Sequence, residues 1–164
     1  MAMQIPGEKM ELRTEVEIEA PPEEVWRVLT DFVRYHEWNP FIVAVEGALS
    51  PGADLRVTLT FPSGEEKRQR CRLLVCDSCE HLRWRTKVLF GVVLDSEHFF
   101  RLVGCDDGRT RLTQGQDFRG WAVKYMGPTF TLTARSFVGM NTALKRRVEQ
   151  GLRAAPAKHC SALP

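Results

Sequence analysis

Apolar and polar residues alternate with a period of two over most of the chain, and a helical period replaces this alternation only toward its C-terminal end. Alternation predicts strands with one buried and one solvated side, because successive side chains of a strand point to opposite faces. The alternating runs end at turn-forming residues, such as Pro62-Ser63-Gly64 and Asp107-Gly108. We predict seven strands, at 10–19, 41–46, 55–61, 67–75, 82–88, 94–102 and 110–119.

Two short helices are predicted between the first and second strands. Pro22 with two acidic residues after it suits the first turn of one helix, since acidic side chains favour the positive end of the helix dipole. Asp31 is the expected cap of the second helix. That helix must end before Pro40, because a proline disfavours helical backbone at the residue that precedes it.

A long helix is predicted at 128–151. Phe130, Phe137 and Leu144 recur there at the spacing of one helix face. Gly151 is the expected C-terminal cap, because glycine readily adopts the left-handed conformation. A helix of this length that follows a series of strands is expected to bury its apolar face against their sheet.

Composition predicts one domain in a reducing compartment. A chain of 164 residues with 43% apolar residues can build one sizeable core, which we place at 10–152, between a disordered extension at 1–9 and a flexible tail at 153–164. No signal peptide and no run of 18 apolar residues is found, so we expect a cytoplasmic protein without integral membrane association. Five cysteines without a secretory context predict reduced thiols. A net charge of +2 gives no support for a nucleic-acid partner.

The predicted order of elements is one strand, two short helices, six strands and a long helix. With the stretches VEIEAPPEEVWRVLTDFVRYHEWNPF, SEHFFRL, DGRTRLTQGQDFRG and SFVGMNTALKRRVE, this order resembles the START-like or SRPBCC superfamily, and within it the polyketide cyclase/dehydratase-like branch. The resemblance covers 10–151. It implies an α+β helix-grip fold, in which a curved, seven-stranded antiparallel sheet wraps around the C-terminal helix and encloses an internal cavity.

A curved sheet that grips one helix leaves a gap along its concave side. Such gaps are typically apolar pockets of about 300 to 1,000 Å³. The apolar residues that face the gap would equally form an ordinary packed core, since protein interiors use the same residue types. The predicted ligand-binding residues are Trp38, Leu59, Leu73, Trp84, Thr86, His98, Phe100, Gln114, Gln116, Phe137, Met140, Asn141 and Leu144.

Among the polar residues of this set, His98, Gln114 and Gln116 are expected on the inner side of adjacent strands. A buried polar group without a partner costs about 1 to 3 kcal/mol, so each must be satisfied. They form either a structural cluster with Asn141 or a water, or a patch that orients a hydroxyl or carbonyl of a ligand. His98 is also a candidate general base, but no inward carboxylate is predicted to orient it, so catalysis is the weaker hypothesis.

Two further features have chemical interpretations. Cys76 and Cys79 have CxxC spacing with His81 nearby, yet no fourth ligand follows, so a hairpin turn is favoured over zinc or thiol redox chemistry and the role of the pair stays open. We expect neither a metal nor a cofactor. A row of basic residues on the convex face favours a solvated surface over an anionic-membrane or nucleic-acid surface: Arg56, Arg68, Arg70, Arg72, Arg83, Arg85 and Lys87.

Three functions are compatible with these features. The favoured hypothesis is a carrier or sensor that holds a small hydrophobic molecule, which is lipid-like, polyketide-like or aromatic. The second is a cofactor-independent aromatase, cyclase or dehydratase, with His98 as base and with Gln114 and Gln116 holding substrate oxygens. The third is a protein-interaction domain similar to chaperone ATPase activators, with the basic convex face as the contact. Fold alone does not distinguish them.

Overall fold

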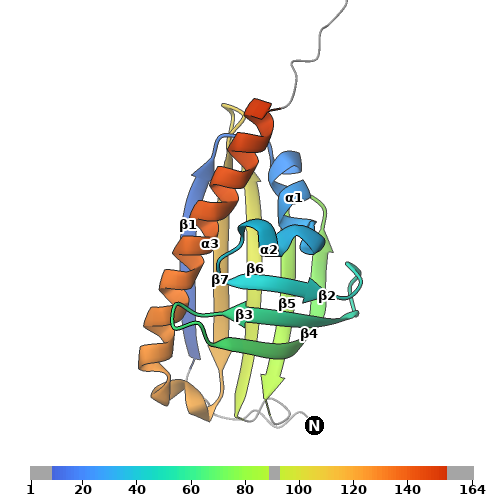
Figure 1. Cartoon of the computed structure of the whole chain (residues 1–164). Helices are drawn as coiled ribbons and strands as arrows, with labels where there is room; N and C mark the ends of the chain where they lie inside the picture. The colour runs from blue at the N-terminus through green and yellow to red at the C-terminus, as the bar shows by residue number, and fades with distance from the viewer. Residues whose placement is uncertain (1–8, 89–92, 155–164) are drawn as a thin grey trace, which may run out of the picture.

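A single seven-stranded antiparallel sheet curls around one long helix (Figure 1). The computed structural model describes residues 9–88 and 93–154. The elements are β1 (Lys9–Ile18), α1 (Pro22–Thr30), η1 (Phe32–Arg34), α2 (Tyr35–Trp38), β2 (Ile42–Glu46), β3 (Asp54–Thr60), β4 (Glu66–Asp77), β5 (His81–Val88), β6 (Leu94–Gly104), β7 (Thr110–Arg119), η3 (Trp121–Tyr125) and α3 (Gly127–Ala154).

The sheet has the order β1-β7-β6-β5-β4-β3-β2, so the first strand pairs with the last. In Figure 1, β2, β3 and β4 run across the direction of β1, β6 and β7, and this bend gives the sheet its concave side. The helix α3 crosses that side and packs mainly against β1. The predicted α+β helix-grip fold is confirmed.

One face of α3 forms the centre of the core, as its spacing predicted. Phe130, Phe137, Leu144 and Val148 are all buried, and so is Met140 between them. Burial of an apolar side chain of this size stabilises a fold by about 1.5 to 3 kcal/mol.

Both ends of the predicted domain differ slightly from the structure. The helix continues through Gly151 to Ala154, so Gly151 is not its cap and the first two residues of the predicted tail are helical. Glycine costs a helix only about 1 kcal/mol, which the surrounding turns tolerate. At the other end, Lys9 already belongs to β1. The rest of the predicted extension and tail, 1–8 and 155–164, lies outside the described residues.

The connection after α1 is also built differently from the prediction. Asp31 makes no capping hydrogen bond, and the chain first forms the 3₁₀ turn η1. The structure is held instead by Tyr35, whose hydroxyl donates to the carbonyl of Leu29 at 2.5 Å. The side-chain oxygen of Asn39 then accepts hydrogen bonds from the backbone amides of Phe41 and Ile42. These bonds fix the conformation of the chain at the start of β2.

An irregularity in β4 reverses the predicted orientation of its last residues. The pairing with β5 shifts between Leu73 and Val75, so Val75 pairs with the outward Arg83 and Cys76 pairs with the inward Leu82. Such a bulge inserts one extra residue and turns the following side chains to the other face. Cys76 therefore packs against the core, and Val75, which was predicted to face inward, lies on the outer side.

The CxxC pair occupies a hairpin, as predicted. Cys76 lies in β4, and Cys79 lies in the turn before β5 with a φ of 64°. Both are free thiols.

The outer face of the sheet carries one buried aromatic ring. Phe99 on β6 lies between the guanidinium groups of Arg13 and Arg83, whose central carbons are 4.6 and 4.9 Å from the ring centroid. Gly115 is its partner on β7, and a methyl group at Gly115 would come within 2.5 Å of the ring. A residue without a side chain is therefore needed beneath Phe99.

We expect Gly115→Ala to lower the free energy of unfolding by about 1 to 3 kcal/mol, because the added methyl overpacks the site and displaces Phe99. For a chain of this size the melting temperature should fall by roughly 3 to 10 °C. The control is Gly127→Ala, where a methyl group meets nothing within 4 Å. Equal melting temperatures for Gly115→Ala and the wild type would show that the packing of Phe99 does not require a glycine at position 115.

Candidate functional site

A cavity of about 310 Å³ lies between the concave side of the sheet and the beginning of α3. Strands β3 to β7 form its sheet wall, and the turns of α3 nearest η3 form the other. Four of the predicted ligand-binding residues line it: Leu59, Thr86, His98 and Gln116. The remaining lining residues are Phe41, Phe61, Lys67, Arg68, Gln69, Arg70, Lys87, Val88, Leu94, Ser96, Phe118, Met126, Thr129 and Thr133.

The polar wall of the cavity comes from three residues on β6 and β7. His98 pairs with Gln116 across the two strands, and Ser96 is two residues before His98 on the same face. The Gln116 side-chain nitrogen donates to the Ser96 hydroxyl oxygen at 3.2 Å. This bond leaves the carbonyl oxygen of the Gln116 amide without a hydrogen-bond partner among the described residues.

His98 is held as a neutral ring within an aromatic cluster. Its ring centroid lies 4.9 Å from those of Phe100 and Phe137 and 5.1 Å from that of Trp84. Burial lowers the pKa of His98 to about 3, because the charged imidazolium would lose its hydration. The Gln114 side-chain nitrogen donates to Nε2 of His98 at 3.0 Å, so the neutral ring carries its proton on Nδ1.

The other nine predicted binding residues do not line this cavity. Side chains fill the space between sheet and helix beyond His98, where the buried rings of Trp84, Phe100 and Phe137 all pack against the imidazole. These nine residues are Trp38, Leu73, Trp84, Phe100, Gln114, Phe137, Met140, Asn141 and Leu144, and their part in ligand binding stays a prediction.

Two polar members of the predicted set belong to this packed region. Gln114 bonds to His98 and, at 3.4 Å, to the Met140 sulfur. Asn141 donates to the Thr14 hydroxyl at 3.0 Å, which is not the partner predicted for it. Each amide retains a buried carbonyl oxygen with no partner among the described residues.

Comparison with known proteins assigns the chain to a family. Residues 9–158 match the family described as polyketide cyclase / dehydrase and lipid transport. The chain belongs to this family. No curated protein matches the chain in sequence.

Several solved structures share the fold of this chain. The Zhui aromatase/cyclase of a Streptomyces species has a TM-score of 0.75 and 21% identity, over 91% of this chain and 99% of that one. A norcoclaurine synthase mutant of Thalictrum flavum, bound to a transition-state analogue, has a TM-score of 0.71 and 13% identity, over 91% and 99%. A Nitrosomonas europaea protein has a TM-score of 0.68 and 18% identity, over 88% and 97%. At these identities the likeness concerns the fold alone.

Several lining residues were missed by the sequence interpretation, although their positions contain a signal. Lys67 and Gln69 follow the same alternation that places Cys71 inward. Ser96 follows that of His98, and Thr133 is on the apolar face of α3 with Thr129 one turn before it.

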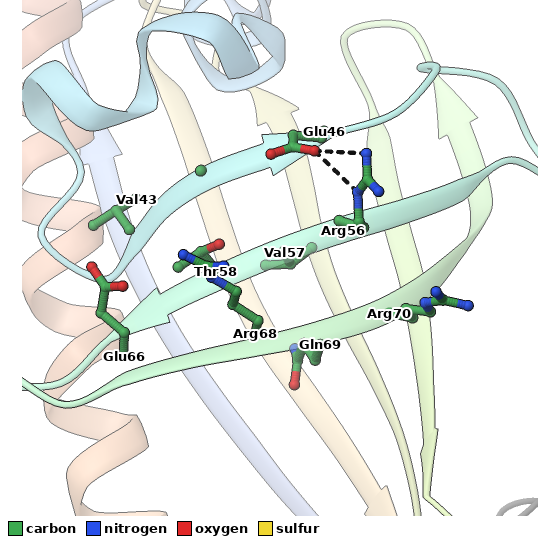
Figure 2. Close-up of a pocket in the computed structure, with 10 residues that line it drawn as sticks. Val43, Glu46, Arg56, Val57, Thr58, Glu66, Arg68, Gln69 and Arg70 are labelled. Atoms are coloured by element: carbon green, nitrogen blue, oxygen red, sulfur yellow. Dashed lines mark hydrogen bonds and ion pairs between the residues drawn. The ribbon is translucent and has the colours of Figure 1, made fainter.

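A larger hollow, of about 720 Å³, lies on the outer face of β2, β3 and β4 (Figure 2). Its charged residues are exposed, and Arg56 pairs there with Glu46 at 2.9 Å. Three more of the predicted convex basic residues are paired, Arg72 with Asp54, Arg83 with Glu97 and Arg85 with Asp95. These pairs agree with the interpretation of this face as a solvated surface.

Within residues 9–88 and 93–154, no three His, Cys, Asp or Glu side chains lie close enough together to form a metal site. None of the helices in this part of the chain is long and apolar enough to cross a membrane.

The burial of His98 makes stability depend on pH. In the folded protein His98 stays neutral down to about pH 3, whereas the unfolded chain protonates it below about pH 6.5. The unfolded state therefore binds more protons in this window, and the free energy of unfolding falls as the pH falls, by up to about 1.4 kcal/mol per unit. Above pH 6.5 this contribution does not change.

Glutamine does not titrate. Between pH 7 and pH 5 the free energy of unfolding should therefore fall by about 2 kcal/mol less in His98→Gln than in the wild type. Urea unfolding at the two pH values measures the difference. His81 and the carboxylates are present in both proteins, and their contributions cancel. Parallel losses in the two proteins would show that the folded state does not hold His98 neutral.

Proposed function

We propose that this protein binds one small, largely apolar molecule in the cavity beside the start of α3, as a carrier or sensor. The observation that carries the proposal is a preformed cavity whose lining combines apolar side chains with one wall of placed polar groups. Leu59, Phe61, Phe118 and Met126 supply apolar surface. Ligand sites typically combine such a lining with a few placed polar groups that fix orientation.

The polar wall favours a ligand that carries a carbonyl or hydroxyl oxygen. The proton on Nδ1 of His98 is a donor, and the carbonyl oxygen of the Gln116 amide is an acceptor. Ser96 adds a hydroxyl group that can serve in either role. Aromatic and polyketide-like molecules have this combination of apolar rings and ring oxygens. The cavity is near the lower limit of known pockets, which favours a compact molecule over a long acyl chain.

Binding is favoured over catalysis by the state of His98. A general base is most effective when its pKa is close to the working pH, and the pKa of His98 is about 3. No carboxylate is within ion-pair distance of its ring among the described residues, so nothing there would stabilise an imidazolium. The cyclase alternative is supported by the family name and the aromatase/cyclase fold, and not by these features.

The protein-interaction alternative has less support. It depended on a basic convex face, and four of the seven basic residues on that face are paired with carboxylates. The pairs of Arg56 and Arg72 are exposed and those of Arg83 and Arg85 are partly buried, and all four lower the net charge that a partner would meet.

We expect Thr133→Phe to reduce binding of the neutral probe N-phenylnaphthylamine at least ten-fold. Thr133 is buried and lines the cavity, and its hydroxyl bonds only within the helix, to the Thr129 carbonyl at 2.8 Å. The added ring would fill the cavity without leaving a buried acceptor unsatisfied. Probe fluorescence titration measures the change.

The matched control is Thr131→Phe, which places the same ring on the exposed side of the same helix. It should bind the probe as the wild type does. If folded Thr133→Phe binds the probe normally, the ligand site lies elsewhere and the proposal fails.

A further inference from the structure

An exposed aromatic pair lies at the end of the molecule where α3 begins. Trp121 and Tyr125 are 51% and 68% exposed, on η3, the orange turn that leads into α3 in Figure 1. Their rings meet edge to face at 6.2 Å, and the Lys124 ammonium lies 4.9 Å from the Tyr125 ring centroid. Large exposed aromatic side chains grouped in this way mark interaction sites.

Buried residues next to Trp121 and Tyr125 hold this pair in place. Val123, between the two aromatics, is 2% exposed and packs in a small core with Phe118 and Phe130. The backbone of Ala122 also donates to the carbonyl of Val93, at 3.2 Å. The exposure of Trp121 and Tyr125 is therefore set by the packing of the residues around them.

The same end of the molecule contains the cavity rim. Met126 follows Tyr125 directly and lines the cavity, as does Phe118 at the end of β7. Lys67 extends from the inner side of β4 at this rim, is exposed, and has no carboxylate within 4 Å in the described part of the chain.

We propose that this end docks on an anionic lipid bilayer, with Trp121 and Tyr125 in the headgroup region and with Lys67 and Lys124 over the lipid charges. Tryptophan and tyrosine favour the membrane–water interface because their rings are apolar and their N–H or O–H group remains hydrated. Each cation near an anionic surface strengthens binding roughly five-fold. The cavity would then open toward the bilayer, from which an apolar ligand could enter.

A bilayer fits these observations better than a protein partner does. A stable protein interface buries roughly 1,200 to 2,000 Å² around a well-packed apolar centre. Two aromatic rings at one tip, with Lys124 beside them, provide too small an apolar centre for this. They do provide what peripheral membrane binding requires, which is a short apolar insertion together with positive charge.

Vesicle sedimentation of the full chain tests the proposal without any ligand. The wild type should sediment with vesicles of phosphatidylcholine that contain about one third phosphatidylserine, and much less with phosphatidylcholine alone or at high salt. The double variant Trp121→Ala/Tyr125→Ala should bind at least ten-fold more weakly, because it loses the apolar insertion. The control Val33→Ser/Val103→Ser removes two exposed apolar side chains elsewhere and should bind normally.

Absence of sedimentation with the anionic vesicles, or unchanged binding of the aromatic double variant, would overturn the proposal. If the wild type does not bind vesicles but captures a protein that the double variant does not, the pair is a protein contact. The result is independent of the proposed ligand site, since neither Trp121 nor Tyr125 lines the cavity. The double variant should still bind N-phenylnaphthylamine in solution.

Discussion

The packing of α3 into the concave side of the sheet is the interaction on which the rest of the structure depends. The helix supplies the apolar surface that covers the inner face of the strands, and Phe137, Met140 and Leu144 are fully buried there. The Phe137 ring packs against those of His98 on β6 and Phe41, which precedes β2. This part of the domain is a solid core.

The cavity arises where that packing changes. Toward its beginning, the inner face of α3 carries Thr129 and Thr133 in place of large apolar residues, and the facing strands carry Ser96 and Thr86. Small side chains on both walls leave volume that large ones fill further along the helix. His98 lies at the boundary, with its ring against the solid core and one side on the cavity.

Much of this fold follows from the sequence, and the site only in part. The period of two placed Ser96, His98 and Gln116 on one face, and the period of 3.6 placed the buried face of α3. The bulge between Leu73 and Val75 was not predicted, because residues 73–76 are all apolar and show no alternation from which the orientation of each side chain could be read. Nor does the sequence show how far the sheet curves from the helix, so it could not separate the residues that fill the core from those that line the cavity.

The central claim is that a ligand occupies the space beside Thr133 and leaves the core beyond His98 intact. A crystal structure of the protein with N-phenylnaphthylamine tests it most directly. We expect density for one probe molecule in contact with Thr133, Gln116 and Phe118, with the rings of Trp84, Phe100 and Phe137 in their present positions. Density for the probe among those three rings, or on the outer face of β2 to β4 with the cavity unfilled, would contradict the account.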